Sequence, residues 1–160
     1  MSSEYINNAE AEKTKKIILC CAINPDGNSF MIAFEDKIRV YQILLTKFKF
    51  YAEFPIKRCC SIVYSHGGQL VACRYGRGIN SCIAIINTLR LVEVGVLKIQ
   101  SDPHQIVWNE LDDELIVATE SNSIQFYTVA DNNRINLIRF DSPVTHVRID
   151  YKMRKILVSA

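Results

Sequence analysis

A pair of large apolar residues recurs about every forty residues along this chain, and that period limits the folds it can adopt. The first members of the pairs are spaced 41, 44 and 41 residues apart, and the second members keep the same spacings. Six mostly polar residues separate the two members, as in "INPDGNSF" (23–30) and "WNELDDEL" (108–115). The eight repeat anchors are Ile23, Phe30, Tyr64, Val71, Trp108, Leu115, Ile149 and Ile156. A period of about 40–45 residues is typical of a propeller blade of four antiparallel strands.

The segments between the anchor pairs also have the composition of strands. "KIRVYQI" (37–43) and "SIQFYTV" (123–129) follow the first and third hairpins, and runs such as "FKFYAEF" (48–54) end the units. β-Branched and aromatic residues dominate these runs, as a pleated, half-buried surface favours. Gly27 follows Pro25-Asp26 and is expected to take a left-handed backbone conformation at the turn. The sequence therefore predicts an all-β fold, a partial β-propeller of about three and a half WD40-like four-stranded blades.

The predicted domain organisation is a flexible N-terminal tail over 1–16 and an incomplete propeller over 17–160. The blades are expected at about 17–56, 57–100, 101–141 and, in part, 142–160. Propellers usually close with about 4–8 blades, so an array of this length leaves sheet edges unpaired. We expect the chain to be a piece of a longer propeller or to be completed by another protein. Trp108, at an anchor position, is expected to be buried.

The composition argues against several classes of protein. The chain is 49% hydrophobic and 22% charged with a net charge of +2, which is typical of a globular domain without a general attraction to nucleic acid. The apolar run 17–23 is far shorter than the roughly 20 residues of a membrane-spanning helix, and 1–16 lacks the apolar core of a secretory signal. The six cysteines are interpreted as small apolar side chains of a reducing compartment, so neither a disulfide nor a metal or other cofactor is expected.

The anchor hairpins resemble those of WD40 repeats. "INPDGNSF" stands where that family has an apolar-Ser-Pro-Asp-Gly turn, and "WNELDDEL" is a close variant. The Trp-Asp pair of the family is replaced by Tyr41-Gln42 and Tyr127-Thr128, so the repeats are degenerate.

A narrower resemblance extends from about residue 18 onward. "AFEDKIRVYQILL", "FPIKRCCSIVYSHGGQLVA" and "IVWNELDDELI" are similar to the start of a propeller in the WD-repeat cilia- and flagella-associated proteins. This resemblance implies a cytoplasmic protein of the ciliary axoneme, in a family tied to inner dynein arms and neighbouring regulatory complexes. The implied function is a non-catalytic scaffold. The implied partners are other axonemal or scaffold proteins, including microtubules and dynein-associated subunits.

No pattern in the sequence indicates catalysis. His66 is expected in a hairpin turn, and His104 and His146 in strands, without the Cys-His or Ser-His spacing of a nucleophile and its base. The acidic run 112–114 is interpreted as a solvated hairpin tip. We therefore expect no enzymatic activity and no catalytic or metal-binding residues.

Two segments are candidate interaction sites. "LLTKFKFYAEFPIKR" (44–58) places Lys47, Lys49, Lys57 and Arg58 among aromatic residues, which would suit an acidic partner such as a microtubule surface. Plain packing of an outer strand with one apolar face produces the same alternation. "RYGRGIN" (74–80) resembles the Arg-Arg-Gly phosphoinositide motif of another propeller group, and Arg74 and Arg77 would clamp a phosphate. A loop that needs Gly76 and Gly78 for its turn explains the second segment equally well. The alternative functions are a phosphoinositide-binding propeller at membranes and a fragment of another cytosolic scaffold.

Overall fold

Strands arranged in four antiparallel sheets make up the computed structural model, which describes residues 17–150 and 155–159. The first sheet contains β1 (Ile18–Ile23), β2 (Ser29–Phe34), β3 (Ile38–Ile43) and β4 (Phe48–Phe54), and the second contains β5 (Ser61–Tyr64), β6 (Leu70–Tyr75), β7 (Cys82–Asn87) and β8 (Val92–Lys98). The third contains β9 (Pro103–Trp108), β10 (Glu114–Thr119), β11 (Ser123–Thr128) and β12 (Arg134–Arg139), and the fourth contains β13 (His146–Asp150) and β14 (Lys155–Ser159). The predicted all-β fold is confirmed. The predicted tail 1–16 lies outside the described residues.

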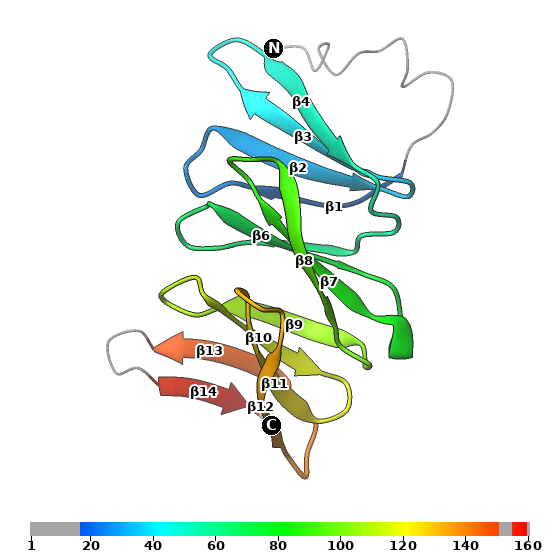
Figure 1. Cartoon of the computed structure of the whole chain (residues 1–160), viewed down its shortest axis with the longest axis vertical. Helices are drawn as coiled ribbons and strands as arrows, with labels where there is room; N and C mark the ends of the chain where they lie inside the picture. Colours follow the sequence, from blue (N-terminus) through cyan, green and yellow to red (C-terminus); the bar gives the residue numbers. More distant parts are fainter. Residues whose placement is uncertain (1–16, 151–154, 160) are drawn as a thin grey trace.

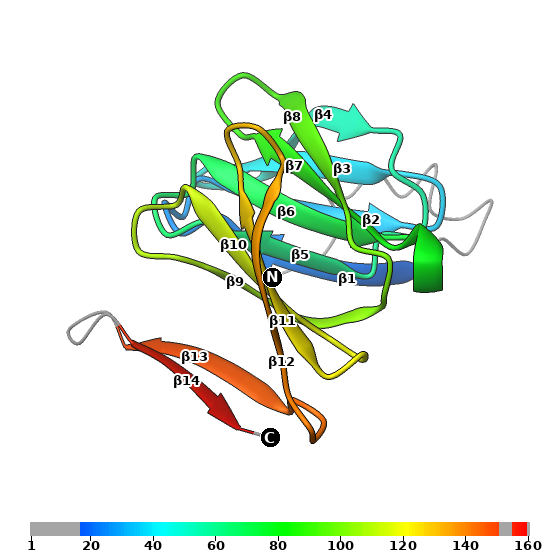
Figure 2. The same cartoon turned by 60° about the horizontal axis from the view of Figure 1, so that its bottom comes forward.

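The strands of each sheet follow one another in chain order, and each is hydrogen-bonded to the next. The four sheets succeed one another along the long axis of the molecule, with the first sheet and the fourth at opposite ends (Figure 1). β1 contacts β5, and β9 contacts β13, so the first strands of neighbouring sheets lie side by side. The two-stranded fourth sheet lies beside the third at the edge of the array (Figure 2).

Apolar layers between neighbouring sheets form the core. We call the face of a sheet that points toward the next sheet along the chain its back face, and the opposite one its front face. The first layer combines Met31, Ala33, Ile38, Val40 and Phe54 on the back of the first sheet with Val71, Cys73, Ala84 and Ile86 on the front of the second. The second layer combines Ala72, Ile83, Ile85 and Leu97 with Trp108, Leu115, Val117 and Tyr127 of the third sheet. Each fully buried aliphatic side chain contributes about 1.5–3 kcal/mol, so these layers hold the sheets together.

One type of hairpin turn joins the first two strands of each four-stranded sheet. Its first residue donates its backbone N–H to the carbonyl five positions later, and its side-chain oxygen accepts a backbone N–H; these residues are Asn24, Ser65 and Asn109. The fourth residue of the turn has positive φ: 73° at Gly27, 71° at Gly68 and 57° at Asp112. The expected left-handed conformation of Gly27 is confirmed. The third turn places an aspartate where the other two have glycine.

The repeat anchors are cross-strand neighbours beside these turns. The four pairs are Ile23–Phe30, Tyr64–Val71, Trp108–Leu115 and Ile149–Ile156. Val71 and Leu115 are 0% exposed, whereas Ile23 is 67% and Ile156 is 37% exposed. The anchors at the two ends of the array, Ile23 and Ile156, are therefore open to solvent, whereas Val71 and Leu115 lie in the core. Among the described residues no sheet covers the front of the first sheet, and no strand pairs with the outer edge of β14.

Candidate interaction surfaces

The front face of the first sheet carries a cluster of aromatic rings from β2, β3 and β4. The Phe30 and Tyr41 rings stack with centroids 5.3 Å apart, Phe48 meets Phe30 edge-on at 5.1 Å, and Phe50 meets Tyr41 edge-on at 6.1 Å. The Arg39 guanidinium lies 5.7 Å from the centre of the Phe50 ring. Cross-strand pairing brings these rings together, because Phe30 is opposite Tyr41 and Tyr41 is opposite Phe50. We call Phe30, Tyr41, Phe48 and Phe50 the aromatic face.

Two of the four rings of the aromatic face are accessible to solvent, whereas Tyr41 is 7% exposed. Phe48 is 47% and Phe50 is 50% exposed, and the neighbouring Ile23 is 67% exposed. Large apolar side chains that gather on an open surface usually mark an interaction site, and rigid aromatic rings are frequent anchors of protein interfaces. The aromatic face therefore has the chemistry of a protein-binding surface.

The predicted cationic residues do not form one patch with the aromatic rings. Lys49 pairs with Gln42 and alternates with Phe48 and Phe50 along β4, so its side chain points to the back of the sheet. Lys47 precedes β4, whereas Lys57 and Arg58 follow it. β4 has seven residues, which separates the two pairs of cations by about 20 Å at roughly 3.3 Å per residue. The structure thus divides the predicted set into two groups at opposite ends of the strand.

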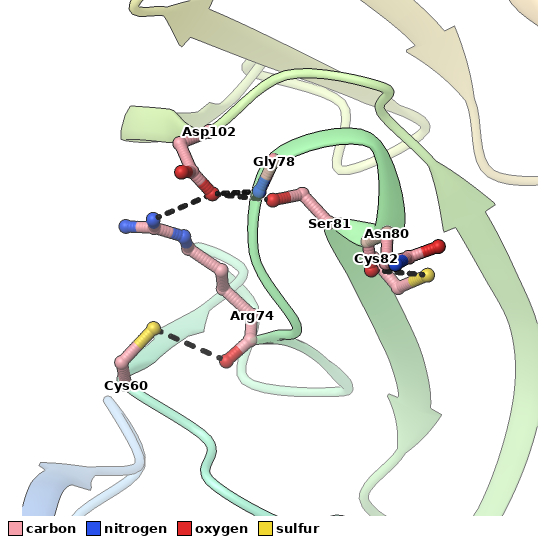
Figure 3. Close-up of polar contacts among 7 residues, drawn as sticks. All are labelled: Cys60, Arg74, Gly78, Asn80, Ser81, Cys82 and Asp102. Atoms are coloured by element: carbon pink, nitrogen blue, oxygen red, sulfur yellow. Dashed lines mark hydrogen bonds and ion pairs between the residues drawn. The ribbon is translucent and has the colours of Figure 1, made fainter.

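The loop that contains Arg74 and Arg77 is organised around a carboxylate of the chain itself. Asp102 Oδ1 accepts hydrogen bonds from the Ser81 hydroxyl at 2.6 Å and from the Gly78 N–H at 2.8 Å, and it forms an ion pair with Arg74 at 3.6 Å (Figure 3). The Ser81 hydroxyl, the Gly78 N–H and the charges of Arg74 and Arg77 hold the pKa of Asp102 below its usual value. Asp102 therefore occupies the place that a bound anion would take beside Arg74.

The glycines of this loop also have a structural role. Gly76 has a φ of 77°, and a Cβ on it would lie 2.2 Å from the Asn80 carbonyl oxygen. Gly78 has a φ of 56° and opens the 3₁₀ helix Gly78–Asn80. Arg77 is exposed, and of the two arginines it is Arg74 that forms an ion pair with Asp102. The geometry favours the explanation of this motif as a turn.

Asp112 connects two hairpin turns that belong to different sheets. Its carboxylate accepts the backbone N–H of His66 at 2.8 Å and that of Gly67 at 2.7 Å. The His66 ring returns a contact, because its Nε2 lies 3.2 Å from the Trp108 carbonyl oxygen, which can only accept a hydrogen bond. The interpretation of 112–114 as a solvated tip was wrong for Asp112. The available sequence signal was its place in the turn, where the other two copies have glycine.

Three further polar contacts link neighbouring sheets about one repeat apart. The Asn24 amide donates to the Gly68 carbonyl at 3.0 Å, and the Trp108 indole donates to the Val63 carbonyl at 3.0 Å. Gln105 exchanges two hydrogen bonds with the backbone of Val147, at 2.8 and 2.7 Å. These side chains satisfy backbone groups that no strand pairs, and so they orient one sheet on the next.

Three of the six cysteines pack as apolar side chains, whereas Cys21 and Cys60 are exposed. Cys59 and Cys73 are buried in the first core layer, and Cys20 packs against it. The Cys59 thiol, together with burial, raises the pKa of Cys20, so this side chain stays a neutral thiol. No group of three potential ligands in residues 17–150 and 155–159 has the geometry of a metal site. Within the part of the chain that the structure describes, no helix has the length and apolar character needed to cross a bilayer.

Comparison with known proteins gives one curated relative of interest. Over 114 residues the chain is 25% identical to Cilia- and flagella-associated protein 57 of Mus musculus, a match that covers 71% of this chain and 9% of that protein. No family model matches the sequence.

Solved structures of WD40 domains share the fold. The C-terminal WD40 domain of Sif2 superposes with a TM-score of 0.72 at 14% identity, over 92% of this chain and 42% of that chain. The WD40 repeats of RRP9 give a TM-score of 0.69 at 13% identity, over 91% of this chain and 51% of that chain. The predicted partial propeller is confirmed. The chain thus has the fold of a partial WD40 propeller, and its sequence is similar to Cilia- and flagella-associated protein 57.

Proposed function

We propose that this chain is a non-catalytic scaffold module that binds other proteins in the axoneme of motile cilia. The observation that carries the binding role is the front face of the first sheet, where Ile23, Phe48 and Phe50 are 67%, 47% and 50% exposed. The axonemal location is supported by the similarity to Cilia- and flagella-associated protein 57. The proposed partners are axonemal or scaffold proteins, one of which completes the propeller.

The finer part of the proposal is a role in docking or regulating inner dynein arms. Lys47 and Lys49, at the start of β4, have no ion-pair partner among the described residues. Exposed cations of this kind suit an acidic partner such as a microtubule or a dynein-associated subunit. Lys57 and Arg58, at the other end of β4, offer a second contact to such a partner.

Fractionation of cilia tests this proposal. The full chain carries an epitope tag in ciliated cells, and purified cilia are treated with detergent and then washed with salt. Retention in the salt-washed axoneme is the expected result. Release with detergent would contradict the axonemal location, and absence from cilia would contradict the ciliary assignment altogether.

A Lys47→Glu, Lys49→Glu variant tests the role of the cations in the same fractionation. The salt concentration that extracts the variant should be lower than for the parent chain, because rim charges govern the salt dependence of association. The matched control is Lys98→Glu, which reverses a charge at the end of β8 instead. Equal extraction of all three chains would remove Lys47 and Lys49 from the binding surface.

A further inference from the structure

A pocket lies between the first and second sheets and reaches the β1–β2 and β7–β8 turns. The back face of the first sheet supplies one wall, where Met31 and Val40 are 0% and 3% exposed. The second sheet supplies Tyr64 from β5 and Leu91 from the β7–β8 turn. The volume of the pocket is about 170 Å³, which is below the roughly 300–1,000 Å³ of pockets for drug-sized ligands and cofactors. The pocket therefore suits a single side chain rather than a nucleotide or another large cofactor.

The charges around the pocket favour a cation. Asp26, in the β1–β2 turn, is the only charged side chain among the described residues that line it. Its Oδ1 accepts the backbone N–H of Asn28 at 2.8 Å, and its carboxylate forms no ion pair with a described residue. Lys49 is opposite Gln42 at the edge of the same face, but its side chain is not part of the lining. The lining therefore carries a net negative charge, which attracts a cation and repels an anion.

The Tyr64 hydroxyl is a second polar group that a ligand could use. It is buried, and no described group meets it with the geometry of a hydrogen bond. Burial, followed by the charges of Cys73 and Asp26, raises the pKa of Tyr64, and the nearby Ser29 side chain opposes this, so the hydroxyl stays protonated. A buried hydroxyl without a partner is costly, and its oxygen can accept a hydrogen bond from a ligand. Asp26 and Tyr64 thus offer two acceptors to a donor that enters the pocket.

An apolar wall next to one negative charge matches a lysine side chain. The four-carbon stem of a lysine packs on apolar groups such as Met31 and Val40, and its compact ammonium group carries three donors. An arginine is a poorer match, because its planar guanidinium suits a bidentate carboxylate, and Asp26 already uses one oxygen on Asn28.

The rim of the pocket indicates that the lysine belongs to a protein. Tyr51 and Leu89 are among the lining residues and are 47% and 72% exposed, so they lie where the pocket meets solvent. Exposed apolar side chains around a pocket give the surface of a partner protein something to contact. A free amine inside the pocket would not use them.

We propose that the pocket between the first and second sheets binds a lysine side chain of a partner protein, with Asp26 and the Tyr64 hydroxyl as acceptors for its ammonium group. The stem of the lysine lies against Met31 and Val40, and the surface around it contacts the rim. The pocket is on the back face of the first sheet, opposite the aromatic face. This inference is therefore independent of the role proposed for the aromatic face and of the axonemal location.

Methyl NMR of the full chain tests the inference. Met31 lines the pocket, and the sequence has only two other methionines, so methionine labelled with carbon-13 at its methyl group provides a local reporter. The Met31→Leu variant assigns its resonance. The ligands added are N-acetyl-lysine methylamide, its norleucine and arginine counterparts, and putrescine as a free amine. We expect the lysine compound to shift the Met31 resonance saturably, at a concentration about tenfold below that of the norleucine compound.

Two substitutions connect this shift to the proposed acceptors. Asp26→Asn keeps an acceptor for Asn28 and removes the charge, so it should raise the half-saturation concentration of the lysine compound by about tenfold. Tyr64→Phe should raise it by about threefold. The matched control is Asp36→Asn, which removes an exposed carboxylate from the β2–β3 turn at the other end of the sheet and should leave binding unchanged. Thermal unfolding of the three variants checks that the fold is retained.

The remaining outcomes overturn the inference. Equal shifts with the lysine and norleucine compounds would show an apolar pocket without recognition of a cation, and equal binding by Asp26→Asn and Asp36→Asn would remove Asp26 from the site. Tighter binding of the arginine compound would replace lysine by arginine, and tighter binding of putrescine would indicate a free amine. A Met31 resonance that none of the four compounds shifts would contradict the site itself.

Discussion

Trp108 is a residue of the third sheet that also contacts the second. Its ring is 2% exposed in the second core layer, and its indole N–H donates to the Val63 carbonyl of the preceding sheet at 3.0 Å. The residue therefore contributes both apolar burial and a hydrogen bond across the joint between sheets. Its place in the repeat indicated the burial, while the hydrogen bond depends on a strand 45 residues away.

Replacing Trp108 should destabilise the whole array. Trp108→Ala removes a large buried ring and leaves a cavity, so we expect a loss of about 3–5 kcal/mol in the free energy of unfolding. Urea denaturation followed by circular dichroism measures this change. A loss under about 1 kcal/mol would contradict the burial of Trp108 between two sheets.

Asp112 should contribute stability through its carboxylate rather than through its backbone conformation. Asp112→Ala removes the acceptor for His66 and Gly67 and keeps a side chain at a φ of 57°, so we expect a loss of about 1–3 kcal/mol. Asp112→Asn retains one carbonyl oxygen and suits positive φ, so it should cost less than half as much. Equal stability of the two variants in urea denaturation would show that the carboxylate is only a solvated tip.

At the scale of the elements, one loop connects neighbouring sheets as the strands do not. The first two strands of each four-stranded sheet are joined by the same type of hairpin turn. The connection from β6 to β7 is different, because Asp102, from the segment before β9, accepts hydrogen bonds from Gly78 and Ser81 in it. This carboxylate holds the loop of one sheet against the chain that leads into the next. The loop therefore connects the second sheet to the segment that leads into the third.

The Asp102 contacts should make stability depend on acid pH. The folded state lowers the pKa of this carboxyl below that of the unfolded chain, about 3.9 for an aspartate. The ionised group therefore contributes fully above about pH 4–5, and its contribution is lost as the pH falls through the lower folded value. The difference in free energy of unfolding between the parent chain and Asp102→Asn should shrink from pH 6 to pH 3. A difference that is constant over this range would contradict the contacts of Asp102.

At the scale of the whole molecule, the array has two unlike ends. The first sheet presents aromatic rings to solvent, whereas the back of the fourth presents His146, Arg148 and Ser159. The interior joints between sheets combine apolar layers with a few hydrogen bonds.

The open aromatic face should bind a dye that reports apolar surface. We expect the isolated chain to enhance the fluorescence of anilinonaphthalene sulfonate, and Phe48→Ser with Phe50→Ser to remove most of the enhancement. The paired control, Val92→Ser with Val94→Ser, changes side chains that are 46% and 44% exposed on β8 and should have little effect. An equal decrease in both double variants would show that the aromatic face is not the main apolar surface.

The period and its strands follow from local chemistry, which is why the sequence predicted them. Alternating apolar residues and a turn that needs positive φ at Gly27 act within a few neighbouring residues, so each hairpin could be located from its own segment. The period shared by four such hairpins then predicted the propeller, and two of the hairpins resemble WD40 turns. The same reasoning located the anchor pairs, since each pair flanks its own turn.

The candidate sites depend on contacts between residues far apart in the chain. Ile23 and Trp108 occupy the same position of the repeat, yet one is 67% and the other 2% exposed, because only Trp108 has a sheet in front of it. Arg74 could suggest an anion site until Asp102, 28 residues later, was seen to neutralise it. A repeating pattern specifies what each blade is made of. Which of its faces is covered is settled by the neighbour that packs against it, and that neighbour has no signature in the local sequence.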